Sequence, residues 1–217
     1  MSTLENPALF VKKTLVWMFL LCLVPGHAMA ARLPGYVLYS DSDPAASYLG
    51  IPPGGRQAVR QAVNAAIRKD PRNAVALSHR AYLFVDSGDL KRARRDFDAA
   101  LASAEPGSDP ARNVLWSRGW ANYDLGEVDA ALADWEQALA LHGGHPYWAT
   151  YTLALGYWTR GDADAALAWY SAAVEAVPVM GTAAGMEQRI RHWRAPQQLH
   201  MRALFAAWKA RQPAVAG

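Results

Sequence analysis

The residues best suited to chemistry form small groups, and each group lacks a part that its chemistry needs. His142 and His145 flank a pair of glycines, a spacing at which two imidazole rings can reach one metal ion. No third ligand accompanies them, and Ser117 and Ser171 lack the strand–turn–helix context of a nucleophile elbow. A glycine-rich phosphate loop with its lysine is also missing. We therefore predict no catalytic residues, no metal and no cofactor.

A second group is basic. Lys91, Arg92, Arg94 and Arg95 are close neighbours in the chain, and their helical spacing places them on an outer face. A solvated charged surface is the ordinary interpretation of such a run. An acidic partner or anionic lipid headgroups are the alternatives.

Two arginine–aspartate pairs recur at one spacing. They are Arg80 with Asp96 and Arg118 with Asp134. The same spacing occurs a third time, but there the two residues are Leu153 and Trp169. Because the charges appear and disappear as a pair, we infer ion pairs that join two helices, with an apolar contact replacing them in the third place. Recurrence at one position indicates a structural role rather than an active site.

These pairs belong to a repeated element of about 34 residues. The three copies align on a turn glycine: residues 74–107 around Gly88, residues 112–145 around Gly126 and residues 147–180 around Gly161. An acidic residue follows each glycine, which suits a helix that ends in left-handed backbone just before the next helix begins. Each copy predicts two antiparallel helices, which must stack on neighbours to bury their apolar face.

The copies resemble the tetratricopeptide repeat, in which small residues and aromatic residues alternate along two helices. The third copy supplies Thr150, Leu153, Ala154, Tyr157, Ala166, Tyr170, Ala173 and Pro178. The first supplies Leu77, Arg80, Ala81, Phe84, Ala93, Phe97 and Ala100, and the second supplies Leu115, Arg118, Gly119, Asn122, Ala131, Trp135 and Ala138. The small residues Ala81, Gly119 and Ala154 would let the helices of a pair approach closely. The resemblance implies an all-α, right-handed superhelical solenoid.

Both flanks of residues 74–180 are predicted to cover the repeats. Residues 56–73 form a lone helix of a degenerate repeat, after an extended lead at 31–55. Residues 181–217 form capping helices and a short tail. An apolar stripe marks the last helix: Met201, Leu204, Phe205 and Trp208. Such covers protect the open ends of a solenoid, although the same stripe could pair two copies of the chain.

The resemblance also implies a concave groove lined by the first helices of the repeats. The residues carried onto that groove are Tyr82, Asp86, Trp116, Trp120, Tyr123, Asp124, Trp148, Tyr151 and Trp158. Aromatic rings offer large contact area at low entropy cost, and the aspartates would accept a basic or amide group of a bound peptide or helix. Two alternatives stay open: the rings, above all Trp148 and Tyr151, pack between helices, or they stack on cell-wall glycan.

The first thirty residues predict export. Two lysines precede an apolar run at residues 15–24, and Ala28-Met29-Ala30 is the small-x-small pattern of a signal peptidase site. Cleavage near Ala30/Ala31 would remove the one cysteine and release the chain to the periplasm or the medium. A retained anchor is the alternative, although a run of about ten residues is short for a span.

Composition excludes a nucleic-acid partner and leaves a binding protein. Residues 31–217 carry 20 basic and 18 acidic side chains, and none of their stretches is apolar enough to span a membrane. We expect a non-catalytic exported scaffold or adaptor that binds a protein partner and supports assembly of an envelope complex. A glycan-binding module is the first alternative, and an enzyme subunit is the second.

Overall fold

The computed structural model describes residues 38–41 and 55–212, which belong to one unit that begins at Ala31. The predicted leader, most of the predicted lead at 31–55 and the end of the tail lie outside the described residues. The helices of the described part are α1 (Gly55–Lys69), α2 (Ala74–Asp86), α3 (Leu90–Ser103), α4 (Asp109–Asp124), α5 (Val128–His142), α6 (Tyr147–Arg160), α7 (Ala163–Ala176), the short 3-10 helix η2 (Pro178–Gly181), α8 (Ala183–Ile190) and α9 (Ala195–Ala210).

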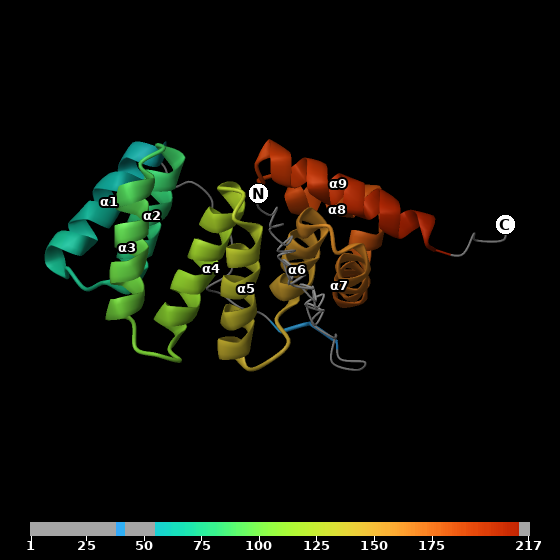
Figure 1. The fold of residues 1–217 in the computed structure, drawn as a ribbon, viewed down its shortest axis with the longest axis horizontal. Helices are drawn as coiled ribbons and strands as arrows, with labels where there is room; N and C mark the ends of the chain where they lie inside the picture. The colour runs from blue at the N-terminus through green and yellow to red at the C-terminus, as the bar shows by residue number, and fades with distance from the viewer. Residues whose placement is uncertain (1–37, 42–54, 213–217) are drawn as a thin grey trace, which may run out of the picture. The chain divides into compact units, whose positions relative to one another are not determined.

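Three helix pairs form the centre of this unit (Figure 1). α2 packs on α3, α4 on α5 and α6 on α7, and the pairs stack in chain order through contacts of α2 with α4 and of α5 with α6. α1 packs on α2 ahead of the first pair, where the sequence predicts a lone covering helix. An all-α solenoid is confirmed, since the described residues are helical apart from turns and one isolated bridge between Asp41 and Pro146.

The turn inside each pair is made by the predicted glycine. Gly88 and Gly126 have a φ of 78°, and Gly161 has a φ of 91°, the left-handed region in which a side chain is strained. The following aspartates Asp89 and Asp162 begin the next helix and accept hydrogen bonds from the backbone of its first turn. Each pair can therefore reverse direction within a few residues.

The second pair uses glycine where the others use alanine because its partner ring is larger. A Cβ atom at Gly119 would lie 2.4 Å from Nε1 of Trp135, which is fully buried. The first and third pairs combine a buried alanine with a smaller ring: Ala81 with Phe97 and Ala154 with Tyr170. The small residue and the ring are thus matched in volume within each pair.

Both predicted ion pairs are present and join the two helices of their repeat. Nε of Arg80 donates to Asp96 at 2.6 Å, and its Nη2 donates to the other carboxylate oxygen at 3.0 Å. Arg118 holds Asp134 in the same two-pronged way, at 2.9 and 2.6 Å. The aspartates are only 2% and 4% exposed, so these guanidinium groups compensate charges that water hardly reaches.

The third pair buries apolar groups at the same positions. Leu153 is fully buried, and Trp169 is 2% exposed. Tyr39, from the short described part of the lead, lies edge-on to Trp169 with ring centroids 5.5 Å apart. The backbone nitrogen of Asp41 then donates to the carbonyl of His145. Residues 38–41 therefore cover part of the third repeat, whereas α1 covers the first.

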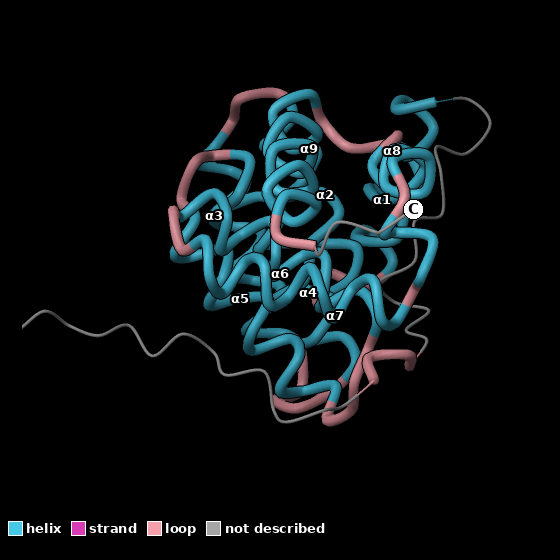
Figure 2. The backbone as a smooth tube through the Cα atoms, turned by 90° about the vertical axis from the view of Figure 1, so that its right-hand side faces the viewer, coloured by secondary structure: helices cyan, strands magenta, loops and turns pink. Residues whose placement is uncertain are grey.

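The C-terminal helices also pack on the last repeat. α9 packs on α6 and α7, and Figures 1 and 2 both show it along one edge of the helix stack. The predicted stripe is buried at Met201, Leu204 and Trp208, and Nε1 of Trp208 donates to Oγ of Ser171 at 3.0 Å. Among the described residues, no helix is long and apolar enough to cross a membrane.

Candidate functional site

The two groove aspartates meet the start of α9. Asp124, at the end of α4, accepts hydrogen bonds from Oη of Tyr82 at 2.9 Å and from Nε2 of Gln197 at 2.5 Å. Nε of Arg194 lies 3.1 Å from the same carboxylate. Asp86, at the end of α2, is hydrogen-bonded by another nitrogen of Arg194. One guanidinium group therefore ties the start of α9 to two successive repeats.

These contacts are of the kind expected from a bound partner, but the chain itself supplies them. The sequence predicts that Asp86 and Asp124 accept a basic or amide group of a bound partner, whereas in the structure Arg194 and Gln197 of the same chain donate to them. Burial raises the pKa of Asp124, while the hydrogen bonds from Tyr82 and Gln197 and the charge of Arg194 oppose that rise. The carboxylate at the end of α4 is thus already satisfied without a partner.

A polar cluster continues this contact farther along α9. Nδ1 of His200 lies 2.9 Å from Oη of Tyr123 and 3.0 Å from Oγ1 of Thr159, and the two hydroxyl oxygens are 2.7 Å apart. Burial is the main cause that raises the pKa of Tyr123 to about 12. The cluster joins α4, α6 and α9. The sequence does not reveal this cluster, because Tyr123, Thr159 and His200 lie on three different helices, far apart in the chain.

The predicted groove rings pack mainly on one another and on the C-terminal segment. Trp148 is 1% exposed, with its ring centroid 4.4 Å from that of Trp116. Trp120 contacts Trp116 and also Trp193, which lies between α8 and α9, at 5.9 and 5.3 Å. Trp193 in turn lies 6.0 Å from Tyr151. Trp148 and Tyr151 therefore pack between helices, which is one of the two alternatives that the sequence leaves open for the groove rings.

The remaining groove residues divide in the same way. Tyr123 is 6% exposed and therefore buried, whereas Tyr82, Trp116, Trp120 and Trp158 are half-buried. Trp158 packs against the same apolar core as Trp116. The sequence treated this face as an open groove because the residues that fill it, from 193 to 200, lie far away in the chain.

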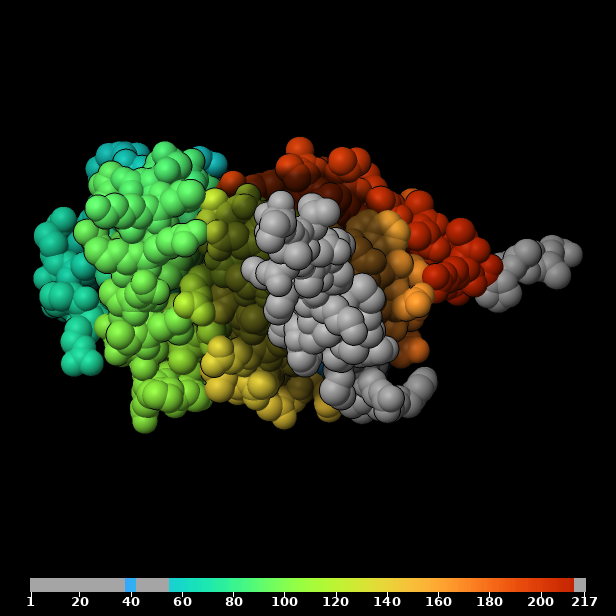
Figure 3. All heavy atoms as spheres, in the orientation of Figure 1, coloured from blue at the N-terminus to red at the C-terminus, as the bar shows by residue number. Residues whose placement is uncertain are grey.

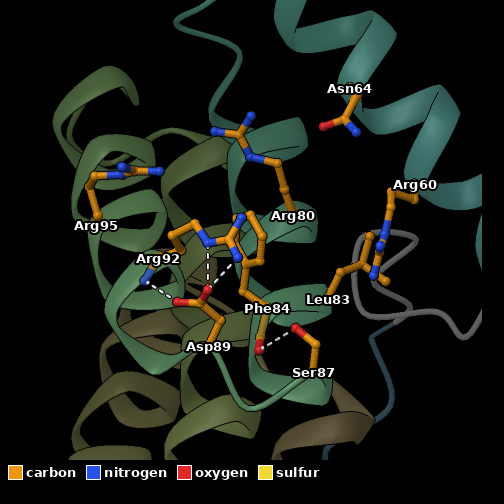
Figure 4. Close-up of a pocket in the computed structure, with 9 residues that line it drawn as sticks. All are labelled: Arg60, Asn64, Arg80, Leu83, Phe84, Ser87, Asp89, Arg92 and Arg95. Carbon is orange, nitrogen blue, oxygen red and sulfur yellow. Dashed lines mark hydrogen bonds and ion pairs between the residues drawn. The ribbon is translucent and has the colours of Figure 1, made fainter.

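An arginine cavity remains at the opposite end of the unit, between α1, α2 and α3 (Figure 4). Its volume is about 590 Å³, and its lining residues are Arg60, Asn64, Arg80, Leu83, Phe84, Ser87, Asp89, Arg92 and Arg95. Figure 3 shows the outer surfaces of α1 and α3 at the end of the unit away from α9. Of the predicted basic cluster, Arg92 and Arg95 line this cavity. Arg94 instead donates to Glu127 at 2.6 Å.

A cavity whose lining is more acidic than basic occupies the equivalent place in the second repeat. It encloses about 430 Å³ between α3, α4 and α5. Its charged lining consists of two arginines and three carboxylates: Arg94, Arg118, Asp98, Glu127 and Asp134. The two cavities therefore differ in charge although the same helix arrangement builds them.

The described residues contain no group of three side chains able to hold a metal ion. Nδ1 of His142 accepts a hydrogen bond from the backbone of Gly144, and the backbone of His145 donates to Asp41 at 2.6 Å. Both histidines thus take part in the turn between the second and third repeats.

Comparison with known proteins agrees with this architecture. A family model described as tetratricopeptide repeat matches the chain three times, over residues 55–110, 78–147 and 117–180. The matches overlap and together span α1 to α7. No curated protein matches the chain. The helix pairs, their turn glycines and these three matches establish that the chain belongs to the tetratricopeptide repeat family.

Proposed function

We propose that this protein is an exported, non-catalytic scaffold that binds a protein partner and supports assembly of a complex in the cell envelope. Tetratricopeptide repeats suggest a protein-interaction scaffold, and the family is typically non-catalytic. The leader-like residues 1–30 support export to the periplasm or beyond.

The observation that carries the proposal is the helix bound on the groove face. Arg194 and Gln197 of the C-terminal segment hold Asp86 and Asp124, and Trp193 lies against Trp120. A face that holds a helix through charged, amide and aromatic contacts has the chemistry of a protein-binding surface. Because the chain's own segment fills it, we place the partner on the open surface around α1 and α3.

No observation favours the glycan alternative. Sugar-binding aromatic rings present a free face, whereas Trp148 and Tyr151 are buried and Trp116 and Trp120 are covered by other rings.

The first experiment tests export and partner binding together. The full chain, with an affinity tag at its C-terminus, is cross-linked inside the cells that make it and then purified. We expect a chain that starts at Ala31 and one envelope protein that co-purifies with it. The complex should re-form from the two purified proteins.

The matched control is the same chain without residues 2–30. It folds the same repeats but stays inside the cytoplasm, so it should not recover the envelope protein. Recovery of the same proteins by both chains would contradict an envelope role. The absence of any partner that re-forms the complex would contradict a scaffold.

A further inference from the structure

The arginine cavity carries more positive charge than its structural role requires. Four arginines and a single aspartate, Asp89, line it. Arg80 donates two hydrogen bonds to Asp96, and Arg92 donates to Asp89. These two arginines therefore have structural partners.

The other two arginines, Arg60 and Arg95, can donate hydrogen bonds to a ligand. The side chain of Arg95 is 68% exposed, and its nearest carboxylate oxygen, on Asp96, lies 3.7 Å away and already accepts from Arg80. Arg60 of α1 is also exposed, and within residues 38–41 and 55–212 no carboxylate lies within ion-pair distance of it. Figure 4 shows Arg60 and Arg95 on opposite sides of the cavity. A ligand between them would be contacted from both α1 and α3.

Part of the cavity wall is apolar. Leu83 and Phe84 of α2 line the cavity and are half-buried. The guanidinium group of Arg92 lies over the Phe84 ring, 4.6 Å from its centroid, which holds one side of the wall in place. A ligand would therefore meet the exposed guanidinium groups of Arg60 and Arg95 together with an apolar part of the wall.

The repeats themselves provide an internal control for this chemistry. The positions of Arg92 and Arg95 are occupied by Ala130 and Ala133 in the second repeat. The third repeat has alanine at both places as well, at Ala165 and Ala168. Because two of three repeats fold with alanine there, the fold does not require these arginines.

We infer that the arginine cavity binds an acidic segment of the partner protein, with carboxylates at Arg60 and Arg95 and an apolar side chain on Leu83 and Phe84. Guanidinium groups bind carboxylates through paired hydrogen bonds. A volume of about 590 Å³ lies in the range of ligand clefts, and a slot between helices admits a peptide more readily than a lipid surface. This inference rests on the proposed function, because it names the surface and the chemistry of the partner.

The test uses a fluorescent peptide of six glutamates around one leucine, with a glutamine peptide of equal length as its control. We expect the exported, purified protein to bind the glutamate peptide and not the glutamine peptide. Replacing Arg60 and Arg95 by alanine should weaken binding roughly tenfold or more, since each loses a charge-assisted contact. Raising the salt concentration should weaken binding to the wild type.

The matched control removes two arginines elsewhere. Arg202 and Arg211 lie on α9 and after it, are 47% and 61% exposed, and pair with Glu187 and Asp164. The double variant Arg202→Ala/Arg211→Ala has the same net charge as Arg60→Ala/Arg95→Ala. It should bind the glutamate peptide as the wild type does. Unchanged melting temperatures would show that both variants are folded.

Three outcomes would overturn the inference. They are equal loss of binding in both double variants, no loss in either, and binding to vesicles of anionic phospholipid without binding to the peptide. The proposed function fails in a different way. A chain that re-forms a complex with its envelope partner after loss of Arg60 and Arg95 is still a scaffold, and only the acidic-segment inference would be wrong.

Discussion

The first and third repeats share one backbone template but bury opposite chemistry at its centre. In the first repeat Arg80 and Asp96 join the two helices, and the cavity beside them is lined with arginine. In the third repeat Leu153 and Trp169 are buried at the same positions, and Tyr39 and α9 cover the surface. The apolar end of the solenoid is therefore covered by residues 38–41 and α9, whereas the charged end keeps an arginine-lined cavity beneath its covering helix α1.

The largest effect should come from breaking the charged centre of the first repeat. Asp96→Ala leaves the guanidinium group of Arg80 without its partner, and we expect a loss of about 3 kcal/mol of unfolding free energy, because the side chain of Arg80 keeps some exposure to water. Asp129→Ala changes a side chain that is 87% exposed, so it should lower the unfolding free energy by less than about 0.5 kcal/mol. Urea unfolding measures both, and equal losses would contradict a buried pair.

Removing both partners of that pair should make the first repeat resemble the third. The double variant Arg80→Met/Asp96→Leu replaces two charges with apolar groups, as the chain itself does at Leu153 and Trp169. It should be more stable than Asp96→Ala, because no charge remains unpaired. A double variant that is less stable than the single one would show that the first repeat cannot accept apolar packing.

A smaller effect should follow from disturbing the matched volumes of the second repeat. Gly119→Ala places a methyl group 2.4 Å from the indole nitrogen of Trp135 and should cost about 2 kcal/mol through overpacking. Adding Trp135→Phe reproduces the alanine and phenylalanine of the first repeat, so it should recover part of the loss. Purely additive losses in the two substitutions would contradict volume matching.

The smallest effect should be local and concern the hold of α9 on the second repeat. Gln197→Ala removes one of the hydrogen bonds to Asp124 and should lower the stability of the first turns of α9 by about 1 kcal/mol. Hydrogen exchange of the α9 amides measures this opening. Gln188→Ala, at an exposed position on α8, is the control, and faster exchange of α9 in both variants would show that the amide contact is not what holds the helix.

Much of the fold could be predicted because the signals are local in the chain. The turn glycines, the small residues and the paired charges each recur at fixed spacing, so three copies support one another. The covering helix α1 and the buried stripe of α9 follow from ordinary apolar periodicity. The sequence also shows the arginines of the first repeat, but only as a basic run. Their spacing does not show that α1 forms the other wall of a cavity.

The contact between α9 and the groove face could not be predicted from such signals. Arg194 and Gln197 reach Asp86 and Asp124 across several repeats, and His200 meets Tyr123 and Thr159 only through the fold. The same residue types line an open groove and a face on which a helix of the same chain packs, so composition does not distinguish the two. The sequence therefore does not show that a helix of the same chain packs on these residues.

Site-specific photo-cross-linking in the cells that make the protein would show which of its surfaces the partner contacts. A photoreactive residue is placed either at Ser87, exposed at the arginine cavity, or at Leu199, which is 64% exposed on α9. We expect a covalent adduct with the envelope partner from position 87 and none from position 199. An adduct from position 199 alone would contradict this expectation and place the partner on the exposed face of α9.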